Sequence, residues 1–417
     1  MRICLLAALS GFMLSYLYTP SAMAGGFYLQ EQSASAMGSA FAGSAAMPRD
    51  ASIVYYNPAG IPDIGERQIY AGASIISARS DMQDRGSTLL GGPVGGVDSD
   101  DAMPVAYLPH FYAVMPIYGE KLWFGVGVST PFGLSTRYNN NWFGRYDAIK
   151  SELRTADVSP NFAMKVNDWL SFGGGANLQF ADAELTSTVT NGVTEGVSML
   201  KGHDWSLGFN AGVMIKPTED TTVGVHYRSP MSHVLDGRIN VRGVAGLNES
   251  TPGTAPLRMP EVLSMGVAHN LDERWTLLGE ANWFGWNRFE GIRAVRSTNN
   301  TVATSINYDY SATWNVGLGF EYQWDARTTL RGGYEYDETP TADKDRSARI
   351  PDGDRNMFAA GMSYRISPKV SFDAGALYAL IFDEEIDVNR NGGVARVHAE
   401  RKDSDFAIVS FGLSYRF

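Results

Sequence analysis

The feature that most constrains the fold is an alternation of apolar and polar side chains that recurs over most of the chain. Between Trp205 and Lys216 every second residue is apolar, and the residues between them are mostly small or polar. The same pattern runs from Trp314 to Trp324. Because successive side chains of a β-strand point to opposite faces, each pattern predicts a strand with one apolar face. Aromatic residues at both ends of that face are typical of a membrane β-barrel.

Segments of this kind follow one another to the C-terminus, and fourteen strands are predicted, at 68–79, 106–118, 121–132, 153–166, 169–188, 203–216, 221–242, 261–270, 274–296, 308–324, 327–337, 354–366, 369–386 and 403–417. Tight turns alternate strictly with long polar loops at 80–105, 133–152, 189–202, 243–260, 297–307, 338–353 and 387–402. Short periplasmic turns and long outer loops characterise outer-membrane barrels. An unpaired sheet edge is not tolerated in lipid, so the sheet must close. We therefore predict an all-β fold, a 14-stranded antiparallel transmembrane β-barrel.

The last strand supports the same prediction independently. Its apolar positions alternate to a terminal phenylalanine: Ala407, Val409, Phe411, Leu413, Tyr415 and Phe417. This run resembles the C-terminal signal by which outer-membrane barrels are recognised for assembly. The barrel assembly machinery is therefore an expected partner.

The first 24 residues have the features of a secretory leader. Arg2 is followed by a mostly apolar run to Leu17 and by the small-residue cleavage site Ala22-Met23-Ala24, so the mature chain should begin at Gly25. Its removal takes away Cys4, the only cysteine, and leaves no disulfide or thiolate chemistry. The formal net charge of −11 argues against a nucleic-acid partner.

Residues 25–64 differ from the rest of the mature chain because they lack the alternation. They are rich in Gly, Ala and Ser and end near Asn57-Pro58-Ala59. Fourteen strands enclose a lumen wider than side chains alone can fill. This segment is the only non-strand stretch of sufficient length on the periplasmic side, which indicates a plug. We predict a signal peptide at 1–24, an N-terminal hatch inside the lumen at 25–66 and the barrel at 67–417.

Four short motifs then point to a known family. They are Gly26-Phe27, Asn57-Pro58-Ala59, Tyr227-Arg228-Ser229 and the run from Ile350 to Arg355. In this order the chain resembles the outer-membrane long-chain fatty acid transporter family (FadL type), which includes aromatic-hydrocarbon transporters. The resemblance covers the whole mature chain. It implies capture of a hydrophobic ligand among the outer loops, movement to a pocket in the barrel, rearrangement of the hatch, and lateral exit at a kink in the third strand.

The loop after the third strand supplies candidate ligand contacts. Phe132, Leu134, Trp142 and Phe143 are expected to bind apolar molecules, and exposed aromatic clusters suit such capture. An interfacial girdle with a self-packing loop is the alternative. From the resemblance, Phe27 is expected to reach toward the inner pocket.

Two features concern the gate and the hatch. Pro131 and Gly133 flank the end of the third strand, where proline cannot donate to the ladder and glycine weakens it. They predict either an interrupted wall at a lateral gate or an ordinary strand end. Asn57, Pro58 and Ala59 form a good turn, so we interpret them as hatch scaffold.

The charge of the inner pocket is the weakest part of the resemblance. Family members that carry fatty acids hold the carboxylate with basic lumen residues. At the expected places this chain has Asp182 and Glu184 on the fifth strand and residues 306–308 near the tenth, none of them basic. Arg228 and Arg288 could substitute, although arginines in a barrel lumen usually pair with carboxylates.

The sequence therefore favours passive uptake of hydrophobic molecules across the Gram-negative outer membrane, with long-chain fatty acids or related compounds as substrates. The first alternative is a channel for uncharged aromatic hydrocarbons or alkanes. A porin and a lipid-modifying enzyme, for which His226 or His110 would serve, are the others. We expect no enzymatic activity, no cofactor and no metal site. The expected surroundings are outer-membrane lipid and lipopolysaccharide around a monomer.

Overall fold

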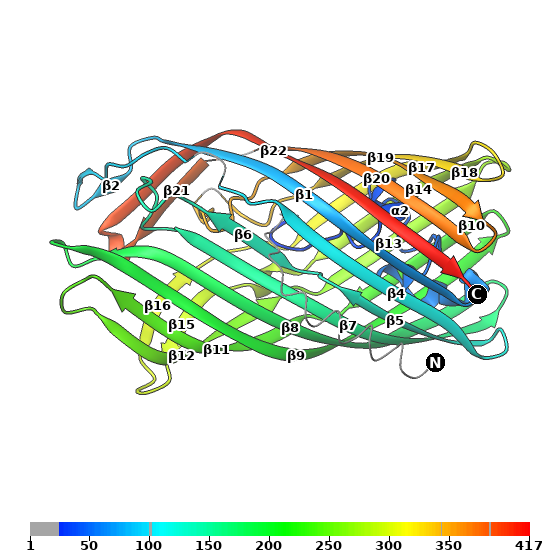
Figure 1. The fold of residues 1–417 in the computed structure, drawn as a ribbon, viewed down its shortest axis with the longest axis horizontal. Coiled ribbons are helices and arrows are strands. Elements are labelled where there is room, and N and C mark those ends of the chain that lie inside the picture. The colour runs from blue at the N-terminus through cyan, green and yellow to red at the C-terminus, as the bar shows by residue number, and fades with distance from the viewer. Residues whose placement is uncertain (1–24, 100–101, 343, 383–384) are drawn as a thin grey trace.

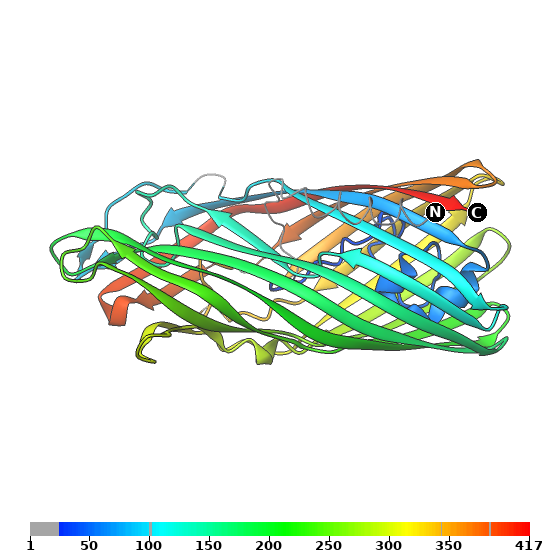
Figure 2. The ribbon, with the colours of Figure 1, turned by 60° about the horizontal axis from the view of Figure 1, so that its bottom comes forward.

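The computed structural model describes residues 25–417 except 100–101, 343 and 383–384, so the predicted leader at 1–24 lies outside the described residues. The described chain forms one closed antiparallel barrel (Figures 1 and 2). The last strand pairs with the first from Gln68↔Arg416 to Asp84↔Ala399, which closes the sheet into a barrel. None of the described helices is long and apolar enough to cross a membrane.

Eight wall positions are filled by single strands: β1 (Gln68–Asp84), β4 (Ala106–Tyr118), β7 (Lys150–Asn167), β8 (Leu170–Thr190), β9 (Glu195–Thr218), β18 (Thr328–Asp337), β19 (Arg355–Ser367) and β22 (Ala395–Arg416). Six positions hold two consecutive strands each. These are β5 (Leu122–Ser129) with β6 (Gly133–Arg137), β10 (Thr221–Arg228) with β11 (Met231–Arg242), β12 (Glu249–Met259) with β13 (Val262–Asn270), β14 (Trp275–Phe284) with β15 (Gly291–Arg296), β16 (Val302–Asn307) with β17 (Thr313–Gln323), and β20 (Val370–Ile381) with β21 (Glu385–Arg390). Over the described residues the barrel thus has the predicted fourteen strands.

Smaller elements lie outside this wall. The strands β2 (Thr88–Leu89) and β3 (Gly92–Pro93) form a hairpin beside the outer end of β22. Two short 3₁₀ turns, η2 (Trp286–Arg288) and η3 (Asn391–Gly393), follow β14 and β21.

The positions of most strands were predicted correctly, but six of the seven predicted long loops contain strand residues. Most of 243–260 is strand β12, most of 297–307 is β16, and parts of 80–105, 133–152, 189–202 and 387–402 also belong to strands. These stretches lie at the outer ends of the strands, where the outward face no longer meets lipid. A strand there needs no apolar face, so the alternation that marks a strand in lipid is absent.

The two faces of the wall have the polarity that a lipid environment requires. Trp205 is 53% and Leu207 72% exposed on the outer face, whereas their inward neighbour Asn210 is buried. This confirms the assignment of faces from the alternation and places the protein in an outer membrane.

The hatch segment, residues 25–65, lies inside the barrel near the end that holds the C-terminus (Figure 1). It contains α2 (Ala34–Met37), α3 (Ile53–Tyr56) and the 3₁₀ helix η1 (Pro58–Ile64). Its backbone touches wall glycines directly: a Cβ on Gly361 would lie 2.5 Å from Gly38 Cα, and one on Gly333 2.0 Å from Ser39 O. The small residues of the segment are therefore required by close packing inside the wall.

Candidate functional site

A cavity of about 800 Å³, measured to its open mouth, lies in the outer half of the barrel. Its walls are mainly aliphatic and come from β7, β8, β9, β11, β12 and β15. The lining includes Leu134, Leu153, Leu185, Leu200, Leu235 and Ile239. Phe27 of the hatch and Phe289 also line it. A site of this size and character suits a largely apolar molecule.

Four charged residues border this cavity, namely Glu152, Lys201, Arg238 and Arg349. Lys201 is four residues from the lipid-facing Trp205 and therefore shares its outward face. Arg238 is the cross-strand partner of Lys201, so it stands on the same face. Glu152 faces Glu184, which is in turn the partner of Lys201. The register thus leaves Arg349 as the charged group that approaches from the lumen.

Arg349 lies in the outer loop between β18 and β19 and is only 4% exposed. Its Nη1 donates long hydrogen bonds to Ser151 Oγ (3.4 Å) and to the carbonyl of Thr186 (3.3 Å). Its Nε has no hydrogen-bond partner, and among the described residues it forms no ion pair. Burial lowers the pKa of this guanidinium, although nearby Asp147 opposes that effect. Such a donor is suited to bind an incoming anion.

Asp147 holds the outer loop that carries Arg349. Its carboxylate accepts hydrogen bonds from Ser347 Oγ (2.8 Å), the amide of Ala348 (2.7 Å) and Arg390 Nε (2.5 Å). Burial alone would raise the pKa of Asp147, but the Arg390 and Arg349 guanidinium groups outweigh it and hold the pKa below its ordinary value. The loop is thereby fixed as a cover over one side of the cavity.

The wall is interrupted beside the cavity, between the end of β5 at Ser129 and the start of β6 at Gly133. In the described chain β6 pairs with β7 and has no ladder with β4. The hatch covers the break: the Leu29 amide donates to Pro131 O (2.8 Å), and the Gly133 amide donates to Phe27 O (3.0 Å). Pro131 and Gly133 therefore flank a real break in the ladder rather than an ordinary strand end.

An aromatic cluster separates the cavity from this break. The Phe27 ring lies 4.7 Å from Trp286, 5.1 Å from Phe289 and 6.1 Å from Phe132, all centroid to centroid. Tyr28, the next hatch residue, bridges to Phe132 as a β-pair, with ring centroids 5.5 Å apart. The cluster therefore lies between the cavity and the break in the wall.

The two arginines expected to bind substrate are already paired. Arg228 Nη2 donates to buried Asp157 (2.6 Å), and its guanidinium lies 4.8 Å above the Tyr55 ring. Arg288 forms an ion pair with Glu261. Neither arginine lines the cavity. Asp182 also lies away from the lumen, because it pairs with His203 on the outward face next to Trp205.

The remaining candidates divide into two groups. Leu134 and Phe27 line the cavity, and Phe132 packs against Phe27. Trp142 and Phe143 are fully buried in a separate cluster of the outer loops, where Trp142 stacks on Tyr138 at 4.0 Å. Their position is the one expected for a self-packing loop.

Asn57 fixes the fold of the hatch and attaches it to the wall. Its Oδ1 accepts from the Ala59 amide (3.1 Å) at the start of η1, where Pro58 sets the first turn. Its Nδ2 donates to Ala45 O (2.8 Å) and to Val213 O (3.1 Å) of β9. These contacts support the scaffold interpretation of the Asn57-Pro58-Ala59 motif.

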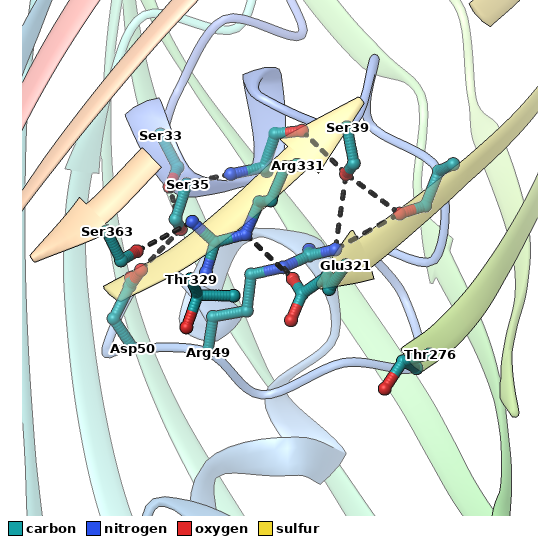
Figure 3. A network of polar contacts seen from close by, with 12 residues as sticks. Ser33, Ser35, Ser39, Arg49, Asp50, Thr276, Glu321, Thr329, Arg331 and Ser363 are labelled. Atoms are coloured by element: carbon teal, nitrogen blue, oxygen red, sulfur yellow. Dashed lines mark hydrogen bonds and ion pairs between the residues drawn. The ribbon is translucent and has the colours of Figure 1, made fainter. Parts of the chain in front are cut away.

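A buried polar network holds the other side of the hatch (Figure 3). Arg49 forms an ion pair with Glu321 on β17 and donates to Ser39 Oγ (3.2 Å). Arg331 on β18 shares the same carboxylate at 2.8 Å. Because both arginines are buried, removal of either would leave charge without a full set of partners.

Apart from Leu134, sequence reasoning missed the aliphatic lining, and it also missed Arg349. The residues around the cavity come from the outer ends of strands and from loops, where the alternation gives no direction. Arg349 directly precedes the Ile350–Arg355 motif, and that adjacency was the one available signal.

Comparisons with known proteins agree with this geometry. A sequence model of the family described as "Outer membrane protein transport protein (OMPP1/FadL/TodX)" matches residues 15–417. The "Long-chain fatty acid transport protein" of Escherichia coli O6:H1 is 27% identical over 399 residues, covering 87% of this chain and 88% of that protein. "Outer membrane protein P1" of Haemophilus influenzae is 27% identical over 400 residues and 86% of each chain.

Solved structures show the same fold. The crystal structure of a Pseudomonas aeruginosa FadL homologue superposes with a TM-score of 0.88 at 24% identity, over 94% of this chain and 100% of that one. The Ralstonia pickettii toluene transporter TbuX superposes with a TM-score of 0.69 at 19% identity, over 94% and 99%.

Proposed function

The chain belongs to the outer membrane protein transport protein family (OMPP1/FadL/TodX), and from this premise we propose that it takes up long-chain fatty acids or related amphipathic molecules passively. It is a 14-stranded outer-membrane barrel for hydrophobic substrates. We assign residues 25–66 to a movable hatch, 67–417 to the barrel and 1–24 to a leader.

One observation carries the choice of substrate. The cavity is aliphatic, and the charged group that reaches it from the lumen is a buried guanidinium without an ion-pair partner among the described residues. A fatty acid supplies both complements, a long apolar chain and a carboxylate. The names of the curated relatives in Escherichia coli agree with this choice.

The route follows from the aromatic cluster and the break in the wall. A shift of the hatch strand at Phe27 and Tyr28 would let the ligand leave the cavity between β5 and β6 and enter the membrane sideways. Lateral exit avoids returning the chain to water, which would cost about 0.8 kcal/mol per CH₂ group. The proposed route passes Phe132, Leu134, Pro131 and Gly133.

Uncharged aromatic hydrocarbons are the second candidate. The cavity offers few polar partners, and the fold is shared with toluene transporters. We propose no enzymatic activity, since the relatives bear transporter names and His110 is stacked on Tyr70 at 5.7 Å inside the wall. Lipopolysaccharide contact, assembly through the C-terminal strand and a monomeric state remain part of the proposal.

The proposal is tested by uptake in cells with and without the protein, offered labelled oleate and labelled toluene in parallel. Protein-dependent uptake of oleate is expected. Uptake of toluene alone would exclude a fatty acid transporter and support the second candidate. Uptake of neither compound would exclude both candidate functions.

A further inference from the structure

The wall of the barrel has a second interruption, along one edge of β12. The ladder between β12 and β15 is short and ends at Thr254↔Val295. The next backbone bond between the two sides runs from the Gly285 amide to Glu261 O (3.0 Å). Between these points no backbone hydrogen bond joins the two sides in the described chain. We call this opening the β12 window, and its edges are residues 255–260 and 286–294.

The window is a built feature of the backbone. The other edge of β12 keeps a continuous ladder with β11, from Met231↔Met259 to Val241↔Glu249. On the far side of the window, the turn η2 separates β14 from β15, and Gly291 restarts the strand at φ +132°, a conformation that favours glycine. An extended stretch of the length of 255–260 spans about 20 Å. The window is therefore long and lies between two well-ordered strand segments.

The cavity reaches both edges of the window. Its lining includes Ala255 and Leu257 from β12, and Phe289 and Ile292 from the opposite edge. Phe289 is buried and stacks on Tyr308, with ring centroids 5.6 Å apart. An acyl chain that enters through the window would therefore meet apolar side chains at once.

The window lies just beyond the outer aromatic level of the wall. Trp283 of β14 and Trp314 of β17 are cross-strand partners, and Trp314 is exposed on the outward face. Because β14 runs outward from the tight turn that precedes it, Gly285 follows Trp283 on the outer side. Aromatic residues of this kind mark the boundary between the hydrocarbon core and the headgroups. The window therefore opens at the level where the polar end of an outer-leaflet amphiphile resides.

An ion pair spans the window on its outward side. Arg258 Nη1 of β12 lies 3.0 Å from Glu290 Oε1 on the opposite edge, and the two side chains are 55% and 77% exposed. Exposed ion pairs contribute little to stability, so this one can open without disruption of the fold. A guanidinium at this place also suits an acidic headgroup, because it can bind a carboxylate or a phosphate.

We propose that the β12 window is a side entrance through which single-chain acidic amphiphiles pass from the outer leaflet into the cavity. The Arg258–Glu290 pair closes the window at rest, and the acidic headgroup competes with Glu290 for the guanidinium. The apolar chain then passes between Leu257 and Ile292 and never enters water, where its CH₂ groups are unfavourable. The inference rests on the proposed uptake of amphipathic molecules, and it adds an entrance that is separate from the exit at Pro131.

The test compares a reagent in the membrane with a reagent in water. Leu200 lines the cavity on β9, where the wall is paired on both sides. The chain has no cysteine beyond the predicted leader, so Leu200→Cys gives one defined thiol inside the barrel. The full mature chain in phospholipid vesicles is treated with hexadecyl methanethiosulfonate dissolved in the bilayer, or with a trimethylammonium methanethiosulfonate dissolved in water. The modified fraction is followed over time by mass spectrometry.

The charge variants are made in the Leu200→Cys chain. Arg258→Glu sets like charges across the window and should raise the labelling rate of the membrane reagent about fivefold, with no change for the water-soluble reagent. Adding Glu290→Arg restores opposite charges and should return the rate to within about twofold of its starting value. Arg296→Glu is the matched control, because Arg296 pairs with Glu249 (2.7 Å) between the same two strands beside their ladder. It should change neither rate.

Arg258 and Glu290 are mostly exposed, so these variants should fold. If Arg258→Glu does not fold, Glu290→Gln serves instead, with an expected increase of about twofold because it only removes the pair. No labelling by the membrane reagent, equal acceleration of both reagents, or an equal effect of Arg296→Glu would overturn the proposal. None of these readouts depends on which substrate is transported, so failure of the side entrance is distinguishable from failure of the proposed function.

Discussion

Replacement of Arg349 by methionine should separate fatty acids from uncharged ligands. Methionine keeps an unbranched apolar side chain in the cavity lining but removes the guanidinium. Arg349 Nε lacks a hydrogen-bond partner and the bonds of its Nη1 are long, so a bound carboxylate would gain most of its hydrogen bonding from this group.

The expected effect follows from the strength of such bonds. A hydrogen bond to a charged group contributes about 1.5–3 kcal/mol, which corresponds to a loss of about 10- to 100-fold in affinity for oleate. The methyl ester of oleate has the same chain without the charge. The affinity of the protein for this ester should change by less than about threefold on the same replacement.

The assay is displacement of a fluorescent fatty acid from the purified protein by oleate and by methyl oleate. Arg288→Met is the matched control, because Arg288 is half exposed, paired with Glu261 and not part of the cavity lining. Equal losses for the two ligands, or no loss for oleate, would refute the assignment of Arg349 as the carboxylate partner.

Three further predictions concern the hatch and the outer cover. Arg49→Met breaks a buried ion pair with Glu321, so it should lower the free energy that holds the hatch in the barrel by about 3–5 kcal/mol and should raise single-channel conductance. Lys216→Met, which breaks a partly exposed ion pair, should not raise the conductance. Burial raises the pKa of Glu31 to about 7, so its contribution to stability is present below about pH 4.5 and lost as pH rises through 7; Glu31→Gln should abolish this decline in thermal melts. Asp147 has a lowered pKa, so its contribution is lost only in acid, and Asp147→Asn should weaken oleate binding about tenfold at neutral pH through its loop.

The strands were predictable because lipid imposes a strict rule on them. Within the membrane the outward positions of β9 and β17 are apolar, and residues such as Trp205 and Trp314 mark the level of the interfaces. The count of fourteen followed from that rule. The rule ends where the outward face of a strand no longer meets lipid, so the stretches that form β12 and β16 were predicted as loops.

The site was predicted only in part. The break at Pro131 and Gly133 could be inferred because proline and glycine restrict pairing locally. The direction of the Arg349 side chain could not be inferred, because it depends on how its loop is fixed. Asp147, about 200 positions earlier in the chain, fixes that loop. The partner of Arg228 could not be identified for the same reason, because Asp157 is 71 residues away.

The central claim is that the hatch must leave the break in the wall before substrate can pass. Tyr28 and Phe132 form a non-hydrogen-bonded antiparallel pair, because the bonds lie at Leu29–Pro131 and Gly133–Phe27. Such pairs have Cα atoms about 4.5 Å apart, which suits a disulfide. The chain has no cysteine beyond the predicted leader, so Tyr28→Cys with Phe132→Cys gives one defined crosslink.

The decisive measurement is oleate uptake by cells carrying this double variant, before and after reduction, with each single variant as control. We expect that uptake is blocked while the disulfide is closed, recovers on reduction, and does not respond to reductant in the single variants. Undiminished uptake with the disulfide fully formed would contradict it, because the ligand would then pass without movement of the hatch from the wall.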